Sequence, residues 1–327
     1  MKTDQVFLVL YFLFTGVIPL FFARNAYVGF LLILLNFYIV LAASWNIVAG
    51  YAGQLSFAHP GLLALGAYSS VFFVAYSHIP LLGLFVGGIV ATAMGLGIGA
   101  VSLRLKGIYF VLATFGFSNI FFELLVSENT ITGGYAGLPT VYLLPASPYA
   151  DFLAYYYISA GIIVAFFLST YLLLKGKFGL FMRSVRDDED AASVYGVNIT
   201  RVKLTAFAVS SFWTGVMGSF YAHLIGYATP SLSGLQEMVN ILFISVLGGL
   251  GGLFGPILGG FVVWPISIIL RTYNATLNVV LFSLIMIIVL KFFGNGLEGF
   301  IQTMARRVRK DRMRSAQKIG VKSPATL

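Results

Sequence analysis

The chain contains 327 residues, of which 59% are hydrophobic and only 9% are charged, whereas an average soluble domain is about 25% charged. This composition excludes an ordinary soluble enzyme and indicates a membrane protein with apolar spans of roughly 20 residues. The net charge of +9 does not indicate a nucleic-acid partner, because the basic residues are not interleaved with aromatic ones. No cysteine is present, which excludes a disulfide, a thiol nucleophile and a thiolate metal site.

Ten apolar stretches follow one another along the chain, near 6–22, 28–48, 61–77, 82–103, 108–126, 152–174, 204–225, 237–250, 256–270 and 277–293. Because they are long and do not alternate with polar residues, they exclude an outer-membrane barrel and predict an all-α, polytopic transmembrane helix bundle. Two of the stretches are short. We therefore expect about 8–10 spans, with broken or re-entrant segments in place of full crossings as the alternative to ten.

The distribution of basic residues predicts the orientation of the bundle. When the stretches cross alternately and residues 175–203 face the cytoplasm, 18 of the 20 Lys and Arg residues lie on the cytoplasmic side, as the positive-inside rule requires. Both termini then lie in the cytoplasm. We interpret the first stretch as a retained span, because no small-residue cleavage site follows it. We expect residues 1–293 to form the transmembrane domain and residues 294–327 to form a basic cytoplasmic tail that attracts anionic lipid, with a specific partner site in the tail as the alternative.

The apolar pattern is interrupted twice without added charge, once near residues 50–61 and once near residues 248–260. Broken backbone at membrane depth is tolerated only where protein or a water-filled cavity satisfies its polar groups, and paired breaks mark the pathway of many transporters. The alternative for each break is a tight hairpin that lets helices pack closely. The residues that we expect along a translocation path are Gly53, Gln54, Ser56 and His59 in the first break and Gly248, Gly249, Gly251 and Gly252 in the second.

No arrangement of residues predicts catalysis or metal binding. The sequence lacks a phosphate-binding Gly-Lys-Ser/Thr motif, a Ser/His/Asp set and an HExxH helix. Its three histidines, at 59, 78 and 223, have no metal-ligand spacing. We therefore expect no catalytic residue, no metal and no cofactor in this chain.

The interval 175–203 holds ten of the charged residues and cannot lie in hydrocarbon. Acidic residues from Asp187 to Asp190 favour the start of a short helix, and Gly196 suits its end. Such a helix, held under two spans, is a knob that the groove of a partner could bind. The alternative is a solvated surface helix with no partner, and a third interpretation is a membrane enzyme that uses the acidic run.

The spacing of Asp190, Ala191, Ala192 and Gly196 resembles the EAA-type coupling segment of ABC importer permeases, with Asp190 in place of the first glutamate. Four stretches in order, Asn46–Tyr68, Thr132–Leu138, Arg183–Arg201 and Gly248–Gly260, resemble the permease subunits of bacterial branched-chain amino acid ABC importers, the LivM type. The resemblance covers roughly residues 40 to 265.

This resemblance implies a non-catalytic subunit of an importer in the cytoplasmic membrane of a bacterium or archaeon. Two permeases, expected to be a heterodimer, form the path. Two cytoplasmic ATPases hold ATP and Mg²⁺, and an extracytoplasmic binding protein delivers a branched-chain or other hydrophobic amino acid. The ATPase would contact Arg183, Arg186, Asp187, Asp188, Glu189, Asp190, Ala191, Ala192 and Gly196. The alternatives are a urea or short-chain amide permease of the same family and an ion-coupled secondary transporter.

Overall fold

The computed structural model of the chain describes residues 25–102, 105, 107–273 and 296–300, together with the single positions 16, 284, 287, 291 and 303. Apart from these single positions, the expected spans 6–22 and 277–293 lie outside the described residues, and so does most of the basic tail.

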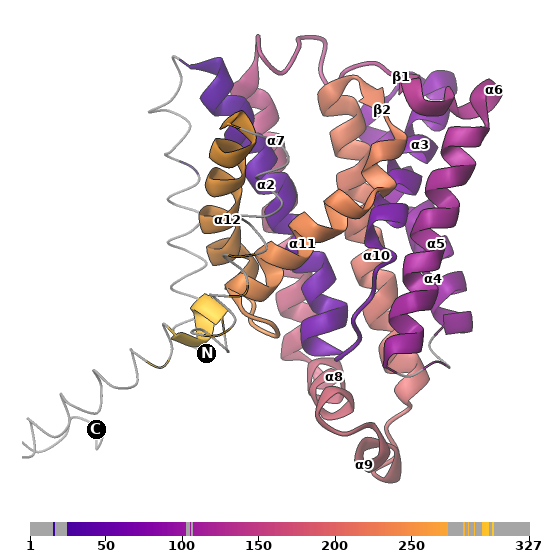
Figure 1. The fold of residues 1–327 in the computed structure, drawn as a ribbon, viewed down its shortest axis with the longest axis vertical. Coiled ribbons are helices and arrows are strands. Elements are labelled where there is room, and N and C mark those ends of the chain that lie inside the picture. Colours follow the sequence, from indigo (N-terminus) through magenta and orange to yellow (C-terminus); the bar gives the residue numbers. More distant parts are fainter. Residues whose placement is uncertain are drawn as a thin grey trace, which may run out of the picture.

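The described chain is a bundle of helices with one short sheet (Figure 1). The long helices are α2 (Ala26–Asn46), α3 (His59–Ser77), α4 (Pro80–Ser102), α5 (Ile108–Ser127), α7 (Phe152–Lys175), α10 (Ile199–Ile225), α11 (Leu235–Gly248) and α12 (Gly255–Tyr273). The short ones are the π-helical turn η1 (Ile47–Tyr51), α6 (Asn129–Thr132), η2 (Gly134–Ala136), α8 (Lys177–Asp187), α9 (Glu189–Val194) and η3 (Pro230–Ser233). Strand β1 (Leu138–Pro139) pairs antiparallel with β2 (Tyr227–Ala228).

The predicted all-α membrane bundle is confirmed. Five segments, α2 with η1, α3, α4, α5 and α7, are long and apolar enough to cross a membrane, and α11 and α12 are shorter apolar helices. One boundary differs from the expectation, because α10 begins at Ile199 and not near residue 204. The Asn198 side chain accepts a hydrogen bond from Arg201 N at 3.0 Å, and this cap starts the helix inside the charged interval.

The core is built around the second half of α2. Every residue from 35 to 52 is buried, which is typical of a helix that is apolar on all sides and surrounded by others. Figure 1 shows α2 crossing the bundle between α7 and α12 on one side and α10 on the other. Within this buried run, α2 passes into the π-helical turn η1 without leaving the core.

Glycines bring α3, α4 and α10 into close contact. A β-carbon at Gly87 of α4 would overlap the Ser219 hydroxyl of α10 and the Gly66 carbonyl of α3. The Ser219 hydroxyl also donates to Gly66 O at 2.9 Å. Small residues at these positions let the backbones approach, as in many membrane helix bundles.

The two ends of the bundle differ in construction. At one end, β2 contacts α3 and α10 and α6 lies at the end of α5, while α8 and α9 project from the opposite end (Figure 1). His223 of α10 fastens the first end, since its Nδ1 lies 2.8 Å from Val141 O and its Nε2 lies 2.9 Å from Ser70 Oγ. A carbonyl only accepts, so Nδ1 carries the proton and the Ser70 hydroxyl donates to Nε2. The imidazole thus has a structural role.

Replacing Gly87 with Val is expected to lower the free energy of unfolding by about 1–3 kcal/mol, because the added side chain must displace Ser219 and the α3 backbone. Thermal unfolding of the purified protein in detergent measures the effect. Gly97 lies on the same helix with nothing within 4 Å of an added β-carbon, so Gly97→Val is the matched control. Equal stabilities of the two variants would contradict the packing described for α3, α4 and α10.

Candidate functional site

The charged interval folds into two helices and not into one. Asp187 is the last residue of α8, and Asp188 adopts an extended conformation (φ −160°, ψ 111°) that separates α8 from α9. The Asp188 carboxylate caps α9 by accepting hydrogen bonds from Asp190 N at 2.9 Å and Ala191 N at 3.0 Å. Glu189 and Asp190 then occupy the first turn, where negative charge favours the helix dipole.

The predicted end of this segment at Gly196 agrees with the structure. Helix α9 stops at Val194, and Gly196 has a φ of +79°, a conformation that glycine adopts without strain. Just before it, Val194 and Tyr195 are 86% and 87% exposed. An apolar pair at the tip of an acidic helix is a feature that the spacing argument missed.

An ion pair joins α9 to the bundle. Lys203 Nζ of α10 lies 2.6 Å from Glu189 Oε1, and the two side chains are 4% and 33% exposed. The sequence did not predict a role for Lys203. Nothing in the residue pattern shows that α10 begins before Lys203 and buries its side chain. This contact holds α9 against the start of α10, so Glu189 serves the fold of the projecting element.

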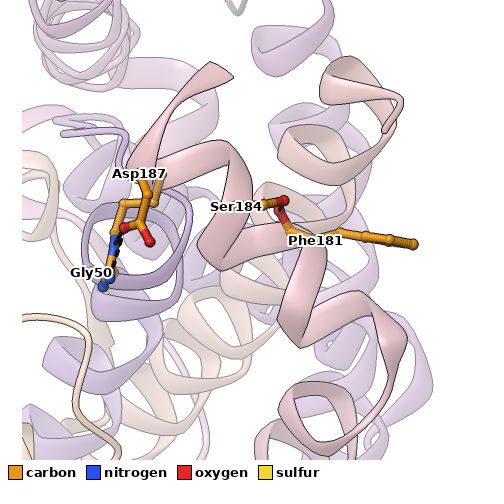
Figure 2. Close-up of polar contacts among 5 residues, drawn as sticks. Gly50, Phe181, Ser184 and Asp187 are labelled. Carbon is orange, nitrogen blue, oxygen red and sulfur yellow. Dashed lines mark hydrogen bonds and ion pairs between the residues drawn. The ribbon is translucent and has the colours of Figure 1, made fainter. Parts of the chain in front are cut away.

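Arg186 joins α8 to the first break. Its Nη1 donates to Gly50 O at 3.0 Å, while Nε and Nη2 donate to Asp187 Oδ1 at 3.1 and 3.0 Å. Figure 2 shows Gly50 and Asp187 together on one face of α8, with Phe181 on the opposite face. The guanidinium reaches the backbone of η1, a contact that the sequence did not predict, and the expected contact of Arg186 with an ATPase stays a prediction.

The two breaks contact each other. Asn46, the last residue of α2, accepts a hydrogen bond from Gly251 N at 3.0 Å and donates one to Gly252 O at 2.8 Å. Gly50 makes this approach feasible, because a β-carbon there would overlap both the Asn46 carboxamide and Gly251 N. The sequence identified each break but gave no sign that they form one junction.

Protein groups satisfy the extended backbone that follows η1. Trp45 Nε1 donates to Ser56 O at 2.7 Å, Phe57 N donates to Thr114 Oγ1 at 3.0 Å, and Ser118 Oγ donates to Phe57 O at 2.8 Å. Thr114 and Ser118 both belong to α5. These three bonds satisfy the backbone of Ser56 and Phe57, as broken backbone inside a membrane protein requires.

Most of the side chains expected along a path are buried in this conformation. Gln54 is 8% exposed, and Ser56 and His59 are fully buried. The His59 Nε2 atom lies 2.7 Å from Ser210 Oγ, which ties the start of α3 to α10. In the same segment Leu55 is 47% exposed. The assignment of these residues to a path stays a prediction.

The second break is formed mainly by backbone. Gly248 and Gly249 are buried, and Gly251 and Gly252 are half-buried. Among the residues that the structure describes, no group of three or more His, Asp or Glu side chains is arranged to hold a metal ion. The site consists of backbone, amide and hydroxyl groups together with the arginine of α8.

Residues 27–290 match the family model of the permease component of branched-chain amino acid transport systems, and the chain belongs to this family. It is similar to the high-affinity branched-chain amino acid transport system permease protein LivM of Salmonella typhimurium and of Escherichia coli K12. Each is 30% identical over 266 residues, which cover 72% of this chain and 62% of the relative.

The permease protein LivH of the same-named system in Salmonella typhimurium is 25% identical over 277 residues, covering 77% of this chain and 88% of LivH. The chain therefore aligns with less of LivM than of LivH. No solved structure matches the chain.

The Glu189–Lys203 pair should respond unequally to loss of either partner. Glu189→Met leaves a nearly buried ammonium group without its carboxylate and is expected to destabilise the α9–α10 contact by about 1–3 kcal/mol. Lys203→Met leaves a carboxylate that water reaches, so its effect should be below about 1 kcal/mol. Thermal unfolding of both variants and of the double variant measures the difference. A larger loss of stability for Lys203→Met than for Glu189→Met would contradict the conclusion that Lys203 is the buried partner of this ion pair.

Proposed function

We propose that this chain is the non-catalytic permease subunit of an ATP-driven importer for branched-chain or other hydrophobic amino acids. Family membership and the similarity to LivM and LivH support an importer of this class over an ion-coupled carrier. The single observation that carries the proposal is the α8–α9 element, which projects from one end of the bundle and is fastened to it by Lys203 and Arg186.

The α8–α9 element has the properties of a docking surface. Helix α9 is short and acid-capped, and it ends in the exposed pair Val194 and Tyr195. A partner groove that covers this pair would gain apolar burial, with the acidic residues at its rim. We assign this surface to a cytoplasmic ATPase that binds ATP and Mg²⁺. Residues 175–203 and both chain termini then lie in the cytoplasm of a bacterium or archaeon.

Two further partners follow from the same proposal. LivM and LivH carry the name of one transport system and both match this chain, so we infer that it pairs with a second, different permease. An extracytoplasmic binding protein would deliver substrate to the opposite end, where β1, β2 and the loop around Val141 lie. Within the chain, the two breaks offer backbone groups suited to the ammonium and carboxylate of an amino acid.

Replacing Val194 and Tyr195 together with Ala is expected to weaken co-purification with the cognate ATPase by about 10-fold or more, because exposed aromatic anchors dominate such interfaces. The fold should be retained, since both side chains project from the structure. Tyr76→Ala is the matched control, as Tyr76 is 89% exposed near the end of α3. Unchanged co-purification of the double variant would contradict docking through α9.

Uptake in proteoliposomes separates the proposed function from its alternative. The chain assembled with its second permease and ATPase, and supplied with the substrate-loaded binding protein, should accumulate a hydrophobic amino acid only when ATP is present with the ATPase. Uptake by the permease chains alone, driven by a sodium or proton gradient, would establish a secondary transporter. Faster uptake of urea than of any amino acid would establish an amide permease.

A further inference from the structure

The carbonyl of Gly50 lies where a helix ends and has no place in the regular hydrogen-bond pattern. Beyond η1, Ala52 N donates to Ile47 O and Gln54 N donates to Val48 O, so the next amides return to earlier turns. Carbonyls in the last turn of a helix need a partner from elsewhere. Arg186 of α8 supplies it through Nη1 at 3.0 Å. A residue 136 positions away thus completes the π-helical turn.

The same guanidinium also lies against the second break. A β-carbon at Gly251 would lie 2.7 Å from Arg186 Nη1, and Gly251 has a φ of +74°. Gly251 N is held by Asn46, which sits one turn before Gly50. One arginine therefore contacts the point at which both breaks meet, and Asn46 bonds the breaks to each other.

Asp187 fixes the direction of the guanidinium. Arg186 Nε and Nη2 both donate to Asp187 Oδ1, at 3.1 and 3.0 Å. The remaining nitrogen, Nη1, is thereby directed to Gly50 O. Because Arg186 and Asp187 are neighbours at the end of α8, this arrangement moves with the helix. Asp188 follows at once as the cap of α9, so the proposed docking helix is separated from Arg186 by a single turn of chain.

The later part of the first break is held without Arg186. The extended segment after η1 is held by Trp45, Thr114 and Ser118, none of which belongs to α8. The Arg186 and Asp187 side chains are 37% and 69% exposed, and an ion pair in water contributes little to stability. The contact is therefore placed to set the position of α8 relative to the junction more than to stabilise the protein.

We propose that Arg186 is a positioning residue that transmits movement of α8 and α9 to both helix breaks through Gly50 O and the Asn46–Gly251 hydrogen bond. This inference rests on the proposed function, because the movement originates in an ATPase docked on α9. When the docked ATPase displaces α8, the guanidinium pulls on the end of η1 and on the backbone of the second break together. Because the junction is rigid, a displacement of α8 at the surface changes the conformation of the proposed translocation path.

Arg186→Met tests the transmission without removing the side chain's bulk. In the assembled importer we expect co-purification and ATP hydrolysis to be retained while uptake per ATP hydrolysed falls about 10-fold or more, the effect of losing one hydrogen bond from a charged donor. Arg186→Lys keeps the charge and one donor and should recover part of the loss. Arg201→Met removes an exposed arginine from the same end of the bundle and should leave the ratio unchanged.

A second readout follows movement at the break directly. The chain contains no cysteine, so Leu55→Cys introduces a single exposed thiol beside Gly53 and Gln54. Its rate of alkylation should change when the partner ATPase is trapped with ATP, and Arg186→Met should abolish this change. A merely structural arginine would alter the rate equally in both nucleotide states.

The outcomes distinguish the two proposals. If the unaltered complex shows no ATP-dependent uptake, the proposed function is wrong. If that complex transports and Arg186→Met has the same uptake per ATP and the same thiol response, the positioning role of Arg186 is overturned. Loss of ATPase binding in Arg186→Met would also overturn it, because the arginine would then act in docking.

Discussion

The rest of the structure depends on one constraint, which is that non-helical backbone inside a membrane protein must find its hydrogen-bond partners within the protein. Asn46, which immediately precedes the first break, meets this constraint for the backbone of the second. Its carboxamide donates to Gly252 O and accepts from Gly251 N, segments 206 and 205 residues away. An amide side chain suits this position because it offers both a donor and an acceptor in one plane. The two interruptions thereby become a single junction at the end of the most buried helix.

The arrangement around this junction links the membrane domain to its projecting element. Helix α2 is enclosed from residue 35 onward, so the junction has a rigid base. Arg186 reaches the junction from α8, and Lys203 fastens α9 to α10. Glycine contacts among α3, α4 and α10 make that part of the bundle dense as well. These contacts connect α8 and α9 continuously to the junction of the two breaks.

Sequence patterns predicted the features that depend on local chemistry. Continuous apolar stretches predicted the helix bundle, Gly and Pro clusters predicted the breaks, and the acid run with Gly196 predicted a short helix start and end. The separate helix α8 before this short helix was not predicted. The start of α10 at Ile199 was not predicted, because the charges of Arg201 and Lys203 mark the end of the apolar pattern in the sequence.

Long-range partners could not be predicted, because they depend on how distant segments pack. Three contacts join different elements whose separation along the chain follows no helical or strand periodicity: Arg186–Gly50, Asn46–Gly251 and Glu189–Lys203. For Arg186, the residue type and its position in the sequence do not reveal which group its side chain contacts. Its place in the charged interval predicted a contact with a partner, which stays a prediction, and gave no sign of the hydrogen bond to the Gly50 carbonyl.

The most direct test of this account is hydrogen exchange of the protein in lipid nanodiscs after Asn46→Ala. We expect residues 248–256 to exchange faster by about 5- to 100-fold, because the buried Asn46 carboxamide at the start of the first break completes the hydrogen bonds of Gly251 N and Gly252 O in the second. Asn36→Ala is the matched control, since Asn36 is a buried asparagine of the same helix that bonds to Ser159. Unchanged exchange in residues 248–256 would contradict the claim that the two breaks form one junction.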